Sequence, residues 1–517
     1  MLPAYARGNS RYINSDISDR ADVRILPPLS RRIKPPLTSG RTLVEVEGAG
    51  ICFRWTDAHD SPEVVLEKRK TGDPLADEAM SELLSTSNPS SSSPTPPPSP
   101  PPTKHKHDFL ALARKQAAAS PSGACAALLN SINEPPPFQV DWSSIARGQD
   151  FFLRRAPSTS LALLHLSLVG GFSSPGINEV LFGTGYLMNS KPSVVQLRLF
   201  ETMAMVIACM AHGPATLREG GGGLEAVARV RLLHAFVRRR LLRRMKGWDE
   251  EKHGIPINQA DMAVTALSFS VNVIFGSEAL GCPATAQDMS DYIHLWKLIA
   301  HRIGVLPENN PHEDYDTAVA GLESYLLALV KPDESSSRAS AAVLSGVADQ
   351  PPFKLTFQRL SSLSRCCMGD ILADALALPP MTAADRIFVA VCKVALRLQS
   401  TIADAFPNFF ARRGENVILA NLEMFLGEKG VAKRFNKTMG GGNDGKPDEK
   451  PGGKPDGKPL TRFGGYDDEE REASLKKLEE NLKALEERKG KRTFTMLNKA
   501  LLGIIVVFVV RAGTSAK

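Results

Sequence analysis

Between residues 52 and 430, apolar side chains recur mainly three or four positions apart, as they do along one face of an α-helix. Alternating apolar and polar runs, which are typical of half-buried strands, are few. The pattern therefore predicts a mainly α fold. The clearest helices are expected at residues 194–211, 224–246, 259–277, 289–303, 316–329 and 383–406.

Two low-complexity segments limit the part of the chain that can form a core. Residues 85–102 read STSNPSSSSPTPPPSPPP, and residues 440–459 contain repeated GKPD-like units. Segments of this composition bury too little apolar surface to fold. We therefore expect a largely disordered N-terminal extension at 1–49, a helical domain at 50–430 with a Ser/Pro-rich insert at 85–105, and a disordered Gly/Lys/Pro/Asp linker at 431–470.

The C-terminal end combines a charged helix with an apolar tail. Leucines at a 3-4-3 spacing within 471–490 predict an amphipathic helix. An apolar tail follows at 494–511, but only residues 500–510 are continuously apolar, fewer than the ~20 that span a bilayer. The tail is either a short membrane anchor or a last buried helix or strand.

The first residues, MLPAYARGNSRYINSDISDR, lack the apolar stretch of a secretory signal. We therefore expect an intracellular, non-secreted protein, held at the endoplasmic reticulum or another endomembrane through the tail.

Composition argues against several classes of protein. The 63 Lys and Arg residues barely outnumber the 56 Asp and Glu residues. A nucleic-acid-binding protein would be expected to carry a basic stripe interleaved with aromatic residues, and the sequence has none. The seven cysteines are widely spaced without a CxxC pair, which excludes a disulfide framework and a structural zinc site. No phosphate-binding glycine loop, GxSxG elbow or HExxH motif is present.

One histidine lies on the apolar stripe of the helix expected at 224–246. Val227, Val230, His234, Val237 and Leu241 follow a 3-4-3-4 spacing, so His234 faces the core. It could be a core histidine whose ring nitrogens are satisfied by hydrogen bonds. Spacing alone favours that interpretation. The alternative is the proximal ligand of a haem iron, which requires a neutral imidazole with a free nitrogen.

A polar group occurs on the preceding expected helix. Arg198 and Thr202 are four residues apart, and Glu201 is three residues after Arg198, so the side chains can share one face. A guanidinium and a hydroxyl in an apolar pocket could orient dioxygen. Alternatively, Arg198 and Glu201 form an ordinary helix ion pair and Thr202 only packs.

Two further arrangements could bind a metal. His294 and His301 share a face of the helix at 289–303, but seven residues of helix rise separate them by about 10.5 Å, so they could instead line a pocket or bond the backbone. Glu250 and His253 form the single Glu-x-x-His pair that a di-iron helical bundle would need. That pair lies in a loop-like sequence.

Several segments in order resemble the family of latex-clearing rubber oxygenases and the endoplasmic-reticulum-bound oxygenase of fungal mycophenolic acid synthesis. The resemblance covers roughly residues 50–430. The segments are FRWTDAHD (53–60), TGDPLADEAM (71–80), VDWSSIARGQDFFLR (140–154), LFGTGYL (181–187), RLFET (198–202), ARVRLLHAFVRR (228–239), INQADMAVTALSFSVNVIFG (257–276) and YIHLWKLIAHRIGV (292–305).

This resemblance implies a globin-like helical core with additional helices, haem b, and cleavage of an isoprenoid carbon–carbon double bond with O2. The proximal histidine of the family falls on His234, which makes the haem ligand the favoured interpretation of that residue. The distal arginine and threonine match Arg198 and Thr202. Rubber-cleaving members have a lysine directly before that threonine, where this chain has Glu201.

The expected function is therefore that of a haem-b-dependent oxygenase acting on a hydrophobic isoprenoid or lipid-like small molecule. In this reading His234 binds the iron, Arg198 contacts the cofactor, Arg198 and Thr202 position dioxygen, and Glu201 takes a proton from an allylic carbon. The alternative is a non-catalytic haem- or lipid-binding protein of the same fold on a membrane. A weaker third reading is a tethered helical scaffold without cofactor.

Overall fold

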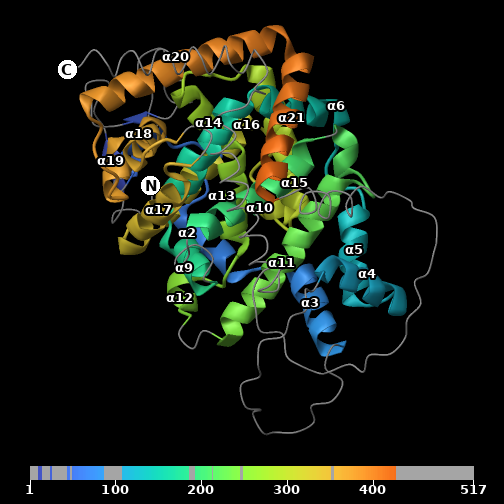
Figure 1. Cartoon of the computed structure of the whole chain (residues 1–517). Helices are drawn as coiled ribbons and strands as arrows, with labels where there is room; N and C mark the ends of the chain where they lie inside the picture. Colours follow the sequence, from blue (N-terminus) through green and yellow to red (C-terminus); the bar gives the residue numbers. More distant parts are fainter. Residues whose placement is uncertain are drawn as a thin grey trace.

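Helices make up most of the fold (Figure 1). The computed structural model describes residues 10–13, 24–25, 43–46, 49–86, 108–184, 192–211, 213–244, 248–350 and 354–426. Within these ranges, the mainly α class expected from apolar spacing is confirmed. The linker at 431–470, the helix at 471–490, the tail at 494–511 and nearly all of the Ser/Pro-rich insert lie outside the described residues.

A small four-stranded sheet precedes the helices. Its strands are β1 (Ser10–Ile13), β2 (Arg24–Ile25), β3 (Leu43–Val46) and β4 (Ile51–Arg54), in the order β1-β3-β4-β2. β3 pairs antiparallel with β1 and β4, and β2 pairs parallel with β4. Three of these strands, β1, β2 and β3, lie within the N-terminal extension expected at 1–49, and most of that extension lies outside the described residues. Alternation places Val44 and Val46 in the core, a short signal that the helical pattern obscures.

The remaining elements are helical. In chain order they are α2 (Pro62–Glu67), η2 (Lys68–Lys70), α3 (Pro74–Thr86), α4 (Phe109–Ala119), α5 (Ala124–Asn133), α6 (Trp142–Arg154), α7 (Ala156–Ala162), the π-helical η3 (Leu163–Leu168), α8 (Val169–Gly171), α9 (Pro175–Gly183), α10 (Pro192–Met210), η4 (Pro214–Leu217), α11 (Gly222–Arg244), α12 (Glu250–His253), α13 (Gln259–Phe269), α14 (Val271–Ala279), α15 (Ala286–Arg302), η5 (Pro307–Asn309), α16 (Tyr315–Leu329), α17 (Glu334–Val347), α18 (Phe357–Met368), α19 (Asp370–Ala375), α20 (Ala383–Ala405) and α21 (Pro407–Leu426).

Five of the six clearest expected helices form as single helices, with ends within three residues of the prediction. These are α10, α11, α15, α16 and α20. The sixth, expected at 259–277, is broken at Ser270, whose backbone leaves the helical region at φ −110° and ψ −79°. The buried Ser270 hydroxyl donates to the carbonyl of Ala266 at 2.9 Å and lies 2.8 Å from the Nε2 of His312. A serine that bonds both its own helix and a neighbouring side chain can bend a helix in this way.

Helix α11 lies between two apolar clusters. On one side Leu224, Ala228, Leu232 and Ala235 pack with α3, α4 and α5 in a small cluster of their own. On another side Val227 belongs to the main core, which also contains residues of α6, α10, α13, α14, α15 and α16. Figure 1 shows α3, α4 and α5 grouped beside α11 at one side of the molecule. Because α11 is packed on two sides, residues along it are held firmly in place.

Within the part of the chain that the structure describes, one stretch is long and apolar enough to cross a membrane. It runs over residues Gln259–Ala279, and 67% of its apolar window is buried inside the fold. A second candidate pairs Ala156–Gly171 with Pro175–Gly183, but the two parts are bent by 95°. Burial of Gln259–Ala279 on this scale is typical of a core helix of a folded domain.

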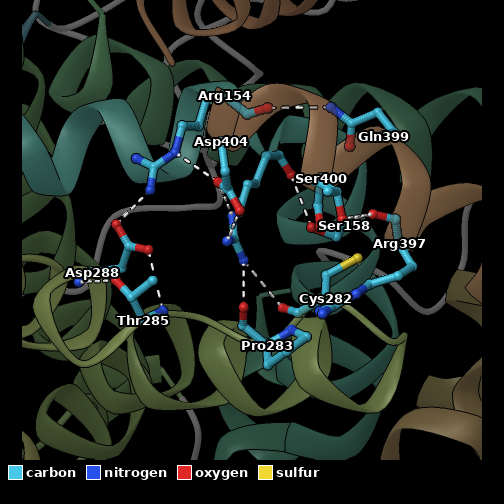
Figure 2. Close-up of polar contacts among 12 residues, drawn as sticks. Arg154, Ser158, Cys282, Pro283, Thr285, Asp288, Arg397, Gln399, Ser400 and Asp404 are labelled. Atoms are coloured by element: carbon cyan, nitrogen blue, oxygen red, sulfur yellow. Dashed lines mark hydrogen bonds and ion pairs between the residues drawn. The ribbon is translucent and has the colours of Figure 1, made fainter. Parts of the chain in front are cut away.

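A polar network fixes α20 to the rest of the fold (Figure 2). Arg155, which is almost fully buried, pairs with Asp404 of α20 and donates to the carbonyl of Pro283 at 2.8 Å. Arg154 bridges Asp288 and Asp404, the latter at 3.2 Å. These contacts connect the end of α6 and the start of α15 with α20, so one side of α20 is anchored to the core.

Candidate functional site

A buried ion pair lies three residues before His234 on α11. Arg231 donates two hydrogen bonds to Asp73, Nε to Oδ2 at 2.6 Å and Nη2 to Oδ1 at 2.9 Å. The two side chains are 7% and 3% exposed. A bidentate pair of this kind compensates two charges that would otherwise be costly to bury. It fixes α11 against the segment that leads into α3.

A second arginine lies four residues after His234. Arg238 pairs with Asp77 of α3 and donates to the carbonyls of Pro256 at 3.0 Å and Ile257 at 2.7 Å. Because helix positions i−3 and i+4 share a face, both arginines lie on the His234 side of α11. His234 is thus bracketed by two charged side chains that are held from outside the helix.

The chain around residue 304 packs tightly on this arrangement. Gly304 has a φ of +105°, and a Cβ added there would lie 2.2 Å from Oδ2 of Asp73, so only glycine fits. Gln259 donates to the carbonyls of Gly72 at 2.6 Å and Gly304 at 3.0 Å and accepts from the N–H of Leu306 at 2.9 Å. Segments at 71–80, 228–239, 257–276 and 292–305, separate in sequence, therefore meet around the middle of α11.

His234 has the properties that an iron ligand requires. The residue is half-buried, and its Nδ1 is buried without a hydrogen-bond partner. The pKa of His234 falls from 6.5 to about 4. Burial is the main cause, the positive charge of Arg238 also lowers the pKa, and the negative charge of Asp73 raises it. The ring is therefore neutral at pH 7, and its buried Nδ1 makes no hydrogen bond within the described residues. A neutral imidazole is the form that binds a haem iron.

Other core histidines show how this differs from a satisfied ring. His312 bonds at both nitrogens, through Nε2 with Ser270 Oγ at 2.8 Å and through Nδ1 with Asn310 Oδ1 at 2.9 Å. His165 and His301 resemble His234, since each has one buried nitrogen without a partner. An unpaired nitrogen therefore does not by itself distinguish His234 from these two histidines.

The polar group on α10 is arranged as an ion pair. Arg198, which is 9% exposed, contacts Glu201 through Nη1 and Oε2 at 2.8 Å. This contact is the helix ion pair that one of the two interpretations expected. Thr202 is exposed, so the threonine and the arginine differ in burial although they are one turn apart. Helices α10 and α11 pack against each other, which places Arg198 and His234 on neighbouring helices.

The alternative metal candidates take structural positions. His294 accepts a hydrogen bond from the backbone N–H of Asp141 at 3.0 Å, one of the roles expected for it. His301 meets the ring of Phe138 edge-on at 5.7 Å. Glu250 and His253 form the short helix α12 instead of a loop. Within the described ranges, no three His, Cys, Asp or Glu side chains gather as a metal site.

A cavity of about 60 Å³ lies elsewhere, between helices of the main core. Its walls come from η3, α8, α9, α13, α14, α16, α18 and α19 and include Gly171, Asn272 and Tyr325. None of Arg198, Glu201, Thr202 and His234 lines it. The cavity is mostly apolar and separate from the predicted site.

Sequence reasoning missed the four residues that bracket His234. Asp73 and Asp77 lie in the segment 71–80, and their partners Arg231 and Arg238 are seven residues apart on α11. Two arginines at that spacing share the face of α11 that carries His234, and buried arginines on such a face are a signal that acidic partners are needed elsewhere. Their identity could not be read from the sequence, because Asp73 precedes Arg231 by 158 positions.

Comparison with known proteins assigns the central part of the chain. Residues 162–397 match the model of the family described as ER-bound oxygenase mpaB/B'/Rubber oxygenase, catalytic domain. The rubber oxygenase of Streptomyces sp. (strain K30) is 28% identical over 169 residues, which are 32% of this chain and 41% of the relative's length. The match thus spans less than half of that relative.

The solved structure of a latex clearing protein, LCP, in the closed state is also similar. It shares 16% identity with a TM-score of 0.47, covering 70% of this chain and 95% of that one. Arg198, Glu201, Thr202 and His234 all fall within the family match, whereas Asp73 and Asp77 precede it. Residues 162–397 of this chain are therefore similar to the family of ER-bound mpaB-type and rubber oxygenase catalytic domains.

Proposed function

We propose that this protein is a haem-b-dependent oxygenase that cleaves a carbon–carbon double bond of a hydrophobic, isoprenoid or lipid-like substrate with O2. Similarity to an oxygenase family supports the reaction class. The cofactor assignment rests on the state of His234. Its ring is neutral at pH 7, and its buried Nδ1 has no hydrogen-bond partner among the described residues. The bracketing pairs Arg231–Asp73 and Arg238–Asp77 hold the helix that presents it.

In this proposal His234 is the protein ligand of the haem iron, and Arg198 approaches the cofactor from α10. Haem supplies the activation of O2. Arg198 contributes a permanent positive charge and N–H donors, and the exposed Thr202 contributes a hydroxyl. An ion pair with Arg198 stabilises the Glu201 carboxylate, so Glu201 has to leave that pair before it can take a proton from an allylic carbon.

The substrate we propose is smaller than rubber. Glu201 places a negative charge where the rubber-cleaving members carry a lysine, and its pairing with Arg198 reduces the net charge of the group. The electrostatic field at Glu201 therefore differs from the field at the lysine of the rubber-cleaving members, and a different field favours a different substrate. A prenylated or lipid-like small molecule retains the hydrophobic alkene that the family implies.

Haem binding tests the cofactor assignment. The purified full-length chain, supplied with haem, should show a haem absorption spectrum that His234→Ala abolishes, because the iron loses its protein ligand. His301→Ala is the matched control, since His301 is also a half-buried helix histidine with a pKa of about 4 and an unpaired Nδ1. Normal haem content in His234→Ala, or equal loss in both variants, would refute the assignment.

A second function is favoured by the same Arg198–Glu201 pair. If Glu201 neutralises Arg198 permanently, the fold could bind haem or a lipid without catalysis. Oxygen consumption without added reductant, measured with a panel of prenyl substrates together with aldehyde and ketone analysis, separates the two functions. Turnover supports the oxygenase, and bound haem without turnover across the panel supports the binding protein.

Location at the endoplasmic reticulum or another endomembrane is proposed through the apolar tail at 494–511. Deleting residues 491–517 should move the protein from the membrane fraction to the supernatant. Unchanged fractionation would show that the tail is not the main anchor.

A further inference from the structure

Exposed large apolar side chains concentrate on α20 and the start of α21. In the described part of the chain, Val64, Leu75 and Leu242 are exposed singly at other places. All the other exposed large apolar residues lie between 387 and 417, with exposed fractions from 36% for Ile402 to 70% for Val394. They are Ile387, Val394, Leu398, Ile402, Phe406, Phe409 and Val417. Scattered apolar residues are normal on a surface, but a contiguous group indicates a contact surface.

The spacing of these residues makes a single stripe. Ile387, Val394, Leu398 and Ile402 follow intervals of seven, four and four, which keep one face of a helix. The opposite side of α20 is buried against the core and includes Phe388. A surface helix of a water-exposed domain would normally carry polar residues on its outer face. Here we name this outer face the α20 stripe.

Positive charges flank the α20 stripe on one side. Arg386, Lys393 and Arg397 directly precede Ile387, Val394 and Leu398 in sequence, so each is about 100° from the stripe on the helix. Arg386 and Arg397 are exposed and Lys393 is half-buried, and no ion pair joins any of the three to another described residue.

The acidic residues of α20 do not balance this charge. Asp385 is buried in the capping box with Thr382, and Asp404 is paired with Arg154 and Arg155. The surface around the stripe is therefore apolar and cationic.

The stripe is preformed. The network of Figure 2 fixes α20 from its inner side through Arg154, Arg155 and Gln399. Figure 1 shows α20 along an edge of the molecule, with no labelled helix beyond it. A partner can therefore meet the whole stripe without moving the helix.

We infer that the α20 stripe docks on the surface of a bilayer containing anionic lipids, with the helix parallel to the membrane plane. An apolar face with flanking Lys and Arg is the composition of helices that lie in the interface between headgroups and acyl chains. The flanking cations meet the negative potential of anionic headgroups, which favours a lipid surface over a neutral apolar partner. The inference is independent of the haem assignment.

Tryptophan fluorescence at the stripe tests this directly in the full-length chain. Leu398→Trp places a reporter on the stripe, and Val64→Trp places one at an exposed apolar position on α2 as the matched control. Vesicles of phosphatidylcholine with about 30% phosphatidylserine should shift the emission of Leu398→Trp to the blue. Brominated lipids should quench it. The control should respond to neither, after subtraction of the signal of the unaltered protein.

Three results would overturn the inference. Vesicles could bind the protein while the emission of the tryptophan in Leu398→Trp stays unchanged, which would place the membrane contact elsewhere. A blue-shifted emission without vesicles that grows with protein concentration would show a second copy on the stripe. A blue-shifted emission without vesicles at every concentration would show that another segment of the chain covers it.

The cationic flank is tested separately. Replacing Arg386, Lys393 and Arg397 together by Gln should weaken partitioning into the anionic vesicles by roughly a hundredfold, since each charge contributes about 1 kcal/mol near such a surface. Partitioning into pure phosphatidylcholine should change little. Equal loss on both lipids would contradict the electrostatic part of the inference.

Discussion

Asp73 and Asp77 occupy similar positions at the start of α3 but differ in how much the fold depends on them. Both accept hydrogen bonds from arginines of α11. The Asp73 side chain is 3% exposed, and among the described residues its partner Arg231 donates to no other side chain or carbonyl. Asp77 is 36% exposed. Arg238 keeps two backbone carbonyls as partners even without Asp77.

Asp73→Ala should therefore destabilise the protein by about 3–5 kcal/mol, because it leaves a buried guanidinium uncompensated. Asp77→Ala should cost about 1 kcal/mol, since a half-exposed pair is screened by solvent. Urea unfolding followed by circular dichroism measures both. Equal losses in the two variants would show that burial does not separate the pairs.

Asp261 gives the stability a pH dependence that can be isolated. Burial raises the pKa of Asp261 from 3.8 to about 7, against the lowering effects of Arg69, the Asn258 backbone and Arg238. Between these values the folded protein holds a proton that the unfolded chain has lost, so this contribution to stability falls as pH rises through 7.

The free energy of unfolding of the unaltered protein, minus that of Asp261→Asn, should therefore decrease by roughly 1–3 kcal/mol between about pH 5 and pH 8. The buried histidines titrate in both proteins, so their contribution to the free energy of unfolding cancels in the difference. Urea titrations at several pH values measure it. A difference that stays constant over this range would mean that Asp261 is ionised in the fold.

At the scale of elements, α20 depends on a few polar contacts as well as on packing. Its inner face carries buried residues, but its outer face is apolar as well. Apolar patterning alone therefore does not determine which side of this helix faces the core. The ion pairs of Asp404 with Arg154 and Arg155 determine it, because they hold the inner side of α20 against the core.

Asp404→Ala should loosen α20, because the almost fully buried Arg155 loses its carboxylate partner. We expect a cost of about 2 kcal/mol, moderated because Asp404 itself is 38% exposed, and faster amide exchange in residues 383–405. Asp370→Ala is the control, since Asp370 is 71% exposed where it pairs with Arg365. Mass-spectrometric hydrogen exchange measures the two, and unchanged protection in Asp404→Ala would remove the anchoring role.

At the scale of the whole molecule, the features described here come from different parts of the chain. The family match covers 162–397 and contains the four predicted site residues. Residues before it supply the sheet, the acidic partners of α11 and the small cluster of α3, α4 and α5. The α20 stripe extends past its end. The candidate site therefore rests on contacts that the matched domain does not contain by itself.

The sequence alone determined the mainly α class, the positions of α10, α11, α15, α16 and α20, and the placement of His234 on an inward face. These are local properties, because helical spacing within a few turns fixes which residues share a face. It also allowed both interpretations of Arg198 and Glu201.

Only the tertiary structure paired Arg198 with Glu201, identified Asp73 and Asp77 as partners of α11, broke the helix at Ser270, and turned the α20 stripe outward. Each of these depends on groups far apart in the chain, such as Arg231 with Asp73 or Ser270 with His312. The energy of such contacts comes from burial and charge compensation, which exist only once the chain has folded.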